Sequence, residues 1–397
     1  MIGVDTGTTA PDEVKLGFSD ILDRIRQLTP SIAERREEID NGRRLPPDLV
    51  AALRDTGVFR AAMPTAWGGP GLSSMEQILL IEELARADGS VGWCAMIGMD
   101  SGIYSGYLRP DVARTMFPRL DMISAGWTPP MGRAHEVEGG YRVEGHWRFG
   151  SGCLHADVLS GGCTVFRDGS PLLDEHGKPT WRVMMAHPGS YAIDEASWDT
   201  TGLFGTGSCD YRATDLFVPQ EHSFSFQEPY REGPLHQRSD AILRKMPGVP
   251  LGVARAAIDY VYEIADRKTD QPGVSWRRSQ RVQMVVAECE TRLLAARSAV
   301  FATVEGQWER LAAGQPLTKQ ERAAAALARY NAFRAAKDIT STLVDLVGGD
   351  AIYRRRTPLD RHARDMITAC QHAVGQHRIA ESSGQLLMGS ETDAAFI

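Results

Sequence analysis

The sequence contains no apolar run of the roughly 20 residues that a membrane helix requires. It also lacks an excess of basic residues, since 44 Lys and Arg stand against 51 Asp and Glu, for a formal net charge of −7 at pH 7. Nucleic acids and anionic membranes select basic surfaces. The charge therefore predicts that neither is a partner.

Cysteine is scarce and scattered. None of the six cysteines stands in a CxxC or CxxH spacing, so we predict reduced thiols and neither a disulfide framework nor a metal site. Residues 1–14 are polar and acidic, unlike a signal or transit peptide. These features predict a cytoplasmic protein.

Helical periodicity dominates both ends of the chain. It predicts a series of helices within residues 13–113, among them residues 48–56 and 73–87. Near the C-terminus it predicts longer helices, which fit an antiparallel bundle. These longer helices cover residues 250–266, 276–313 and 318–346.

Alternating, β-rich segments fill the middle of the chain. Gly139-Gly140, Asp168-Gly169 and His176-Gly177 punctuate them as hairpin turns. We therefore predict an α+β fold that is mostly α, in three domains. These are an N-terminal helical domain (1–121), a central β-barrel or β-sandwich domain (122–230) and a C-terminal helical bundle (231–397).

Residues 358–377 carry three of the ten histidines. Interpreted as one helix, this segment places Asp365 and His372, seven residues apart, on the same face. Small and apolar neighbours predict a partly buried His372, which can hold or move a proton near neutral pH. The alternative is a core histidine satisfied by a backbone carbonyl.

Residues 91–107 (VGWCAMIGMDSGIYSGY) predict a buried helix, because nearly all of them are small or apolar. Buried polar groups need partners, and here Asp100, Ser101 and Tyr104 require them. Neighbouring helices or a ligand would satisfy that need.

The order helical, β, helical resembles the acyl-CoA dehydrogenase fold and, within it, the flavin-dependent monooxygenases similar to 4-hydroxyphenylacetate hydroxylase, secosteroid hydroxylase and dibenzothiophene monooxygenase. Five motifs carry the resemblance. They are PTAWGGPGL (64–72), ADGSVGWCAMIGM (87–99), EVEGGYRVEGHWRFGSGCLHAD (136–157), TTGLFGTGSCDYRATDLFVP (200–219) and VGGDAIYRRRTPLDRHARDMITACQH (347–372).

The same motifs argue against an acyl-CoA dehydrogenase, which needs a carboxylate base. In most dehydrogenases of this fold the base follows an Arg-Asp pair in a Tyr-Glu-Gly-Thr setting. Here Arg364-Asp365 is followed by Gln371-His372-Ala373-Val374, without Glu. A second group places the base before a Gly-Pro-Leu-Gly-like turn, and residues 241–248 also lack a carboxylate. Dehydrogenation stays an alternative.

The resemblance implies the oxygenase component of a two-component system. A separate NAD(P)H-dependent flavin reductase would supply reduced FMN or FAD, which reacts with O2 to a C4a-hydroperoxyflavin that hydroxylates an aromatic or polycyclic small molecule. It also implies a homotetramer. The implied catalytic residues are Ser151, hydrogen-bonded to flavin N5, and His372, near C4a. An ordinary glycine-serine turn is the alternative at Ser151.

The resemblance implies two further sets of contacts. The other flavin-binding residues would be Trp127, Thr128, Pro129, Gly150, Gly152, Gly348 and Gly349, where Gly150 and Gly152 would let a flat ring approach the backbone. The substrate-binding residues would be Trp93, Asp100, Tyr104, His155, Phe204 and Ser208.

Two of these positions depart from the related phenol hydroxylases. Asp100 stands where those enzymes tend to carry a histidine, so an N-oxidising, nitrososynthase-like reaction on an amine is an alternative to hydroxylation. Phe204 replaces an arginine, which predicts a more apolar pocket edge.

Overall fold

The computed structural model describes residues 15–394 and 396–397. The prediction made for residues 1–14 lies outside the described part. Among the helices that are described, none is both long and apolar enough to cross a membrane.

Seven helices precede the sheet. They are α1 (Phe18–Glu34), α2 (Arg36–Gly42), α3 (Pro47–Thr56), α4 (Ser74–Ala87), α5 (Gly89–Gly98), α6 (Ser101–Tyr104) and α7 (Pro110–Met116). The predicted helices 48–56 and 73–87 are confirmed within one residue. Helix α4 starts with a capping box, in which Ser73 N–H donates to Glu76 Oε2 at 2.7 Å and Glu76 N–H donates to Ser73 Oγ at 3.3 Å.

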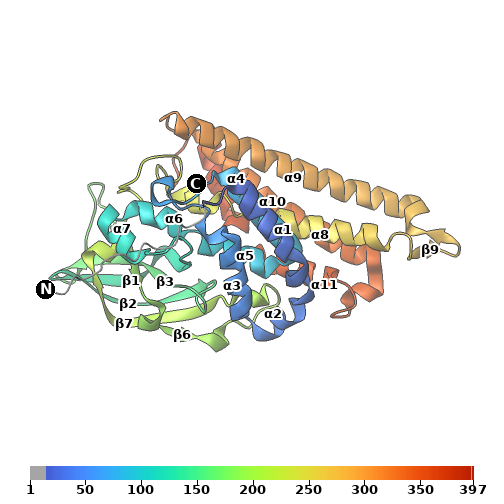
Figure 1. The fold of residues 1–397 in the computed structure, drawn as a ribbon. Helices are drawn as coiled ribbons and strands as arrows, with labels where there is room; N and C mark the ends of the chain where they lie inside the picture. The colour runs from blue at the N-terminus through green and yellow to red at the C-terminus, as the bar shows by residue number, and fades with distance from the viewer. Residues whose placement is uncertain (1–14, 395) are drawn as a thin grey trace.

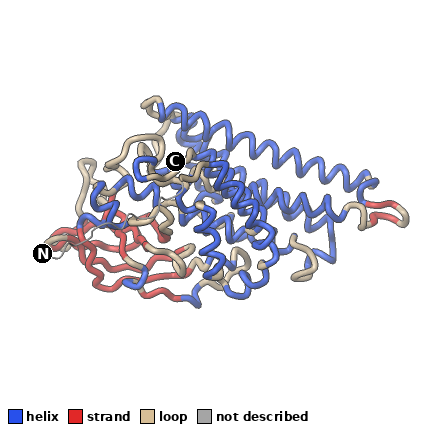
Figure 2. The backbone as a smooth tube through the Cα atoms, in the orientation of Figure 1, coloured by secondary structure: helices blue, strands red, loops and turns tan. Residues whose placement is uncertain are grey.

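A mixed sheet of eight strands occupies the middle of the chain (Figure 2). The strands are β1 (Ser124–Val137), β2 (Gly140–Gly150), β3 (Val158–Arg167), β4 (Ser170–Pro171), β5 (Trp181–Ala186), β6 (Ala192–Asp194), β7 (Cys209–Pro219) and β8 (Ser223–Phe224). Their order is β6-β7-β2-β1-β3-β5-β8, with β4 paired to β3, and only β1 and β3 run parallel. The hairpin turns at Gly139 and at Asp168-Gly169 are confirmed.

Long helices form the C-terminal third. They are α8 (Gly248–Ile264), α9 (Gln280–Ala312), α10 (Lys319–Val347), α11 (Leu359–Ala369) and α12 (Arg378–Leu387). Figure 1 shows the sheet at one end of the molecule, α1 to α5 beside it, and α8 to α10 extending away. A small hairpin of β9 (Thr269–Gln271) and β10 (Val274–Ser275), which was not predicted, lies at the far end of the bundle. The mostly helical α+β class is confirmed.

The prediction of one helix over residues 358–377 was wrong. Helix α11 ends at Ala369, and a short 3-10 turn over Ala373–Gly375 separates it from α12. His372 has extended backbone (φ −62°, ψ 147°), and its Nδ1 accepts the N–H of Val374 at 3.4 Å. The chain reverses tightly here. Gly375 comes so close to Cys370 that a Cβ on Gly375 would lie 2.9 Å from Cys370 Cα. Asp365 and His372 therefore do not share a helix face.

Candidate active site

A cavity of about 590 Å³ lies where α5, β1, the end of β2, the loop before β7 and the end of α11 meet. Its size falls within the roughly 300–1,000 Å³ of sites that enclose small molecules. Four large aromatic side chains, Trp93, Trp127, Phe149 and Trp198, form part of its walls, and hydroxyl and amide side chains form much of the rest. None of the described residues that line it is an Asp, Glu, Lys or Arg.

Five of the predicted site residues meet in this cavity. Trp93, Trp127, Ser151, Ser208 and His372 all line it, although they come from five separate segments of the chain. The sequence analysis missed several other lining residues, which lie next to the quoted motifs or within them. These are Ile97, Gly126, Phe149, Trp198, Thr200, Thr201, Leu203, Ile367, Thr368, Gln371, Ala373 and Gln376.

Buried backbone contacts fix the two tryptophans nearest His372. Asp88 caps the N-terminus of α5, where its Oδ1 accepts the N–H groups of Ser90 and Val91 at 2.9 and 3.1 Å. This orients the helix that carries Trp93. The Trp127 N–H donates to Tyr211 Oη at 2.7 Å, and Tyr211 in turn donates to the Ser160 carbonyl at 2.6 Å.

A row of hydroxyls runs from Trp93 into the protein. Trp93 Nε1–H donates to Ser151 Oγ at 3.0 Å. Ser151 Oγ lies 2.7 Å from Ser208 Oγ, which lies 2.7 Å from Thr206 Oγ1. The Thr206 hydroxyl donates to the Leu203 carbonyl at 2.8 Å. All four side chains are buried, so the row is part of the packed structure.

The turn that carries Ser151 has an unusual backbone. Phe149 adopts φ +63°, a conformation that bulky residues rarely take and that costs about 1–3 kcal/mol. Its exposed ring lies 5.9 Å from the Trp127 ring, at the edge of the cavity. Strain of this kind persists only where the surrounding structure enforces it.

The glycines beside Ser151 are also required by their surroundings within the protein. A Cβ on Gly150 would lie 2.9 Å from the Tyr211 ring, inside the protein. Gly152 has φ +76°, which favours glycine. Packing and backbone conformation therefore account for both glycines without a ring approaching them.

His372 stands between the two tryptophans, with its ring centroid 5.5 Å from Trp93 and 6.4 Å from Trp127. Because Nδ1 accepts a backbone N–H, the neutral ring carries its proton on Nε2. Burial, assisted by the charge of Arg329, lowers the pKa of His372 to about 4. At pH 7 it is therefore a neutral N–H donor, and the expected titration near neutrality is not supported.

A buried guanidinium connects the segments around the cavity. Arg361 Nη2 lies 2.5 Å from Asp88 and 3.1 Å from Asp40, and Arg361 Nε lies 3.8 Å from Asp365. Asp365 Oδ1 accepts the Leu203 N–H at 2.6 Å, which fixes the loop before β7. Burial raises the pKa of Asp365 to about 7, and Arg361 opposes the rise.

The predicted substrate contacts Asp100 and Tyr104 lie outside the cavity. Both belong to a buried region where Lys245 Nζ donates to Asp100 Oδ1. The Tyr104 ring packs against Phe224, 5.3 Å between centroids. Burial raises the pKa of Asp100 to about 6, with Lys245 opposing the rise. Asp100 therefore serves as a structural partner of Lys245, the alternative that the sequence left open.

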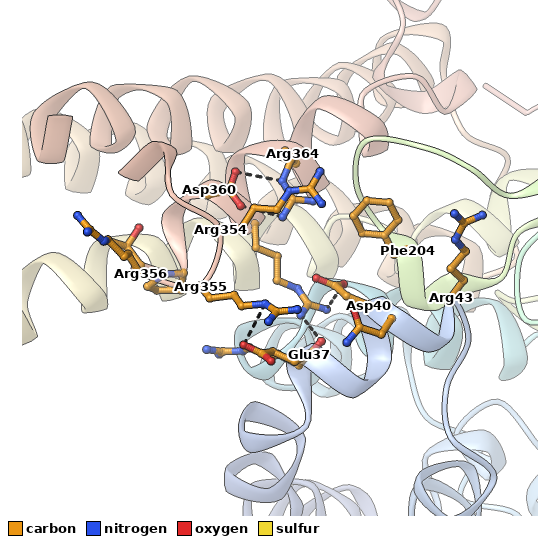
Figure 3. Close-up of a pocket in the computed structure, with 14 residues that line it drawn as sticks. Glu37, Asp40, Arg43, Phe204, Arg354, Arg355, Arg356, Asp360 and Arg364 are labelled. Carbon is orange, nitrogen blue, oxygen red and sulfur yellow. Dashed lines mark hydrogen bonds and ion pairs between the residues drawn. The ribbon is translucent and has the colours of Figure 1, made fainter. Parts of the chain in front are cut away.

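His155 and Phe204 are also placed elsewhere. His155 is enclosed behind the Ser151 turn, where burial lowers its pKa to about 4 and no described residue accepts or donates at Nε2. Phe204 lines a second cavity of about 510 Å³, with the Arg364 guanidinium 5.4 Å from its ring centroid. Figure 3 shows Phe204 and Arg43 on one side of this arginine-lined cavity and Arg355 beside Glu37 on the other. The cavity edge at Phe204 is therefore lined by arginines, unlike the more apolar pocket edge that was predicted there.

The remaining flavin predictions fall on the backbone of β1 and on the end of α10. Thr128 and Pro129 lie where β1 is irregular, and their carbonyls approach Gly162 closely. Gly348 and Gly349 border open space, next to Asp350, which pairs with Lys268 at 3.1 Å. None of these four residues lines the aromatic cavity.

Removal of the Arg361 charge should destabilise the protein strongly. In Arg361→Met, Asp88 and Asp365 would stay buried without a counter-charge, so we expect a loss of about 3–5 kcal/mol in the free energy of unfolding. Chemical denaturation measures this loss. Arg35→Met, which breaks surface pairs with Glu38 and Asp48, is the control and should shift the midpoint far less. Equal shifts would contradict the organising role of Arg361.

The Asp100–Lys245 pair offers a second stability test. Lys245→Met should cost about 3–5 kcal/mol, because it leaves Asp100 buried and unpaired. The double variant Asp100→Leu/Lys245→Met should recover most of that loss, because no charge is left in the core. Denaturation of both variants measures the difference. A double variant as unstable as Lys245→Met would argue against the pairing.

The pKa of His372 predicts a pH-dependent contribution to stability. The unfolded chain takes up this proton near pH 6.5 and the folded protein only near pH 4, so protonation favours unfolding in between. As the pH falls from 6.5 to 4, the free energy of unfolding should decrease relative to that of His372→Asn, by at most about 1.4 kcal/mol per pH unit. Denaturation curves of both proteins across this range measure the difference. Parallel pH profiles would contradict the low pKa.

Comparisons with known proteins place the chain in a family. Models of the acyl-CoA dehydrogenase N-terminal and C-terminal domains match residues 20–109 and 247–377. An indole-3-acetate monooxygenase of Acinetobacter baumannii is 31% identical over 89% of this chain and 90% of its own length. The flavin-dependent monooxygenase oxygenase subunit HsaA of Rhodococcus jostii is 28% identical over 89% of this chain and 94% of its own length. The crystal structure of a 3-HSA hydroxylase from Rhodococcus sp. RHA1 superposes with a TM-score of 0.86 at 26% identity, covering 95% of this chain and 99% of that one.

Proposed function

Since the chain belongs to the acyl-CoA dehydrogenase family, and within it to the flavin-dependent monooxygenases, we propose that its aromatic cavity binds reduced flavin together with an aromatic substrate. The chain is the oxygenase component of a two-component system, which uses reduced flavin from a separate reductase and O2. It hydroxylates an aromatic small molecule.

The composition of the cavity is the observation that carries this proposal. Flat aromatic walls suit a flavin ring, and the only ionisable lining side chain among the described residues is His372. A dehydrogenase of this fold would need a carboxylate at the reacting carbon. The cavity supplies none in the described chain, which favours oxygenation over acyl-CoA dehydrogenation.

We assign the flavin contacts to Trp93, Trp127, Ser151 and His372. When bound, the reduced flavin supplies the two electrons that let dioxygen react with the substrate. Ser151 offers a buried oxygen at the wall, and His372 holds its proton on Nε2. The Trp127 ring lies 5.9 Å from the Phe149 ring and 6.4 Å from the His372 ring, so these side chains border the same space.

The lining also bears on the substrate. An uncharged aromatic or polycyclic compound fits best, because the described walls offer no cation to pair with a carboxylate. Polar groups of such a substrate would meet Thr201, Gln371 or Gln376. N-oxidation of an amine had Asp100 as its support, and that carboxylate is occupied by Lys245, so hydroxylation is the better supported reaction.

Three further points stay predictions. They are the homotetramer, the cytoplasmic location, and the division into domains at residues 1–121, 122–230 and 231–397. The NAD(P)H dependence of the flavin reductase also stays a prediction.

Loss of Ser151 or His372 should uncouple the reaction. Purified variants are mixed anaerobically with reduced FMN or FAD and then with O2, and both the return of oxidised flavin and the release of hydrogen peroxide are followed. We expect Ser151→Ala and His372→Ala to speed both by about tenfold or more, because each removes a polar group that we assign to the reacting ring. His135→Ala, an exposed residue on β1, is the control.

The wild-type protein should delay the return of oxidised flavin. If it re-oxidises the flavin as fast as buffer alone, the proposed function is wrong. If the wild type delays it but neither variant differs from the wild type, only the two assignments fail.

A further inference from the structure

The row of hydroxyls behind Ser151 has a fixed direction. At one end, the Nε1–H of Trp93 can only donate, and at the other the carbonyl of Leu203 can only accept. Between these ends stand the three hydroxyls of Ser151, Ser208 and Thr206. Each of them has one proton to give.

Four protons serve four contacts, so only one arrangement satisfies all of them. The Thr206 proton points to Leu203, because two oxygens 2.8 Å apart without a proton between them would repel. Ser208 must then donate to Thr206, and Ser151 must donate to Ser208. Trp93 donates to Ser151.

This arrangement determines which hydrogen bond Ser151 can form at the cavity wall. A hydroxyl has one proton and two lone pairs. The proton of Ser151 is used by Ser208 and one lone pair by Trp93, so one lone pair remains for the cavity that Ser151 lines. Toward a ligand, Ser151 is therefore an acceptor. It can donate only if a buried hydrogen bond of the row is broken.

We propose that Thr206 and Ser208 are positioning residues that hold Ser151 as an acceptor and so select the reduced form of the flavin. The inference rests on the proposed function, in which Ser151 contacts the flavin, and on the family resemblance, which implies that the contacted atom is the ring nitrogen N5. That nitrogen carries a proton in reduced flavin and is a bare acceptor in oxidised flavin. An acceptor on the cavity wall can accept a hydrogen bond from the N5–H of reduced flavin. With oxidised flavin, the lone pair of this acceptor would face the lone pair of N5, and the two would repel.

The row also connects the two loops that form this wall. The Gly152 N–H donates to the Thr206 carbonyl at 2.9 Å, so the Ser151 turn and the loop before β7 are fixed relative to each other. Thr206, Ser208 and Trp93 are at most 5% exposed, which shields the row from water that would otherwise supply alternative partners. The polarity of Ser151 is thus set by its neighbours in the row, of which Thr206 does not line the cavity.

The test compares the binding of both flavin forms. Dissociation constants of oxidised FMN and FAD, and of the dithionite-reduced forms under anaerobic conditions, are measured by titration, and the midpoint potential of the bound flavin is measured independently. Thr206→Val removes the hydroxyl that sets the direction, and Ser208→Ala removes the acceptor of the Ser151 proton. Both should lower the ratio of the oxidised to the reduced dissociation constant by roughly tenfold, the equivalent of one hydrogen bond. A tenfold change corresponds to a fall of about 30 mV in the midpoint potential.

Two controls separate polarity from packing. Thr206→Ser keeps the hydroxyl and should keep the preference for reduced flavin. Thr340→Val removes an equally buried hydroxyl that donates to the Lys337 carbonyl at 3.0 Å, three residues earlier in α10, and should also keep it. Thr206 likewise donates to a carbonyl three residues earlier, so the pair is closely matched.

The outcomes are distinct. A lower ratio in Thr206→Val and Ser208→Ala, with both controls unchanged, supports the proposal. Ratios within twofold of the wild type in both variants overturn it, as does a wild type that binds both forms equally. If the wild type binds neither form, the proposed function itself fails. Should Thr206→Val not fold, the Ser208→Ala ratio alone decides.

Discussion

The buried guanidinium of Arg361 is the constraint on which the cavity depends. It lies against Asp88, which caps the helix that carries Trp93, and against Asp365, which holds the Leu203 N–H. Its Nη1 also donates to the carbonyl of Arg36 at 2.7 Å, so helix α2 is tied to the same point. Segments that are hundreds of residues apart thus share one charge. Such an arrangement contributes less to net stability than to uniqueness, because desolvation offsets most of the attraction.

This network places charge one layer behind the cavity and keeps it out of the cavity itself. The described lining carries no Asp, Glu, Lys or Arg, and His372 is neutral at pH 7 because burial lowers its pKa. In such surroundings a hydrogen bond is stronger than in water, and an unpaired polar group is more costly. The few polar groups on the wall therefore determine how a ligand is oriented.

Prediction of the fold from the sequence succeeded where a local pattern was sufficient. The helices 48–56 and 73–87 and the hairpin turn at Gly139 all lie in contiguous motifs. Trp93 and Ser151 also lie in such motifs and line one cavity, while their roles stay predictions. Prediction failed where a contact between residues far apart in the sequence determines the position of a side chain. Asp100 pairs with Lys245, 145 residues away, and no periodicity in the sequence indicates that contact.

The break after Ala369 escaped prediction for a related reason. Residues 370–375 have acceptable helix propensity, but the side chain of His372 bonds to the backbone of Val374 and starts a new turn. Phe204 was misplaced because a single residue of backbone in the left-handed region, at Leu203 (φ 53°), turns the chain toward the arginine-lined cavity. Tertiary contacts overrode the local pattern in both cases.

Two of the polar groups on the wall, Ser151 and His372, are of opposite kinds. Ser151 presents a lone pair, because the hydroxyl row uses its proton, whereas His372 presents a proton, because Nδ1 is occupied by Val374. A ligand bound between them satisfies both only if it donates toward Ser151 and accepts from His372. Neither polarity is a property of serine or histidine as such. Each follows from a second contact within the protein, and the backbone at Leu203 and at Val374 provides the groups that set those contacts. The chemistry of the site is therefore determined as much by the fold behind the wall as by the side chains on it.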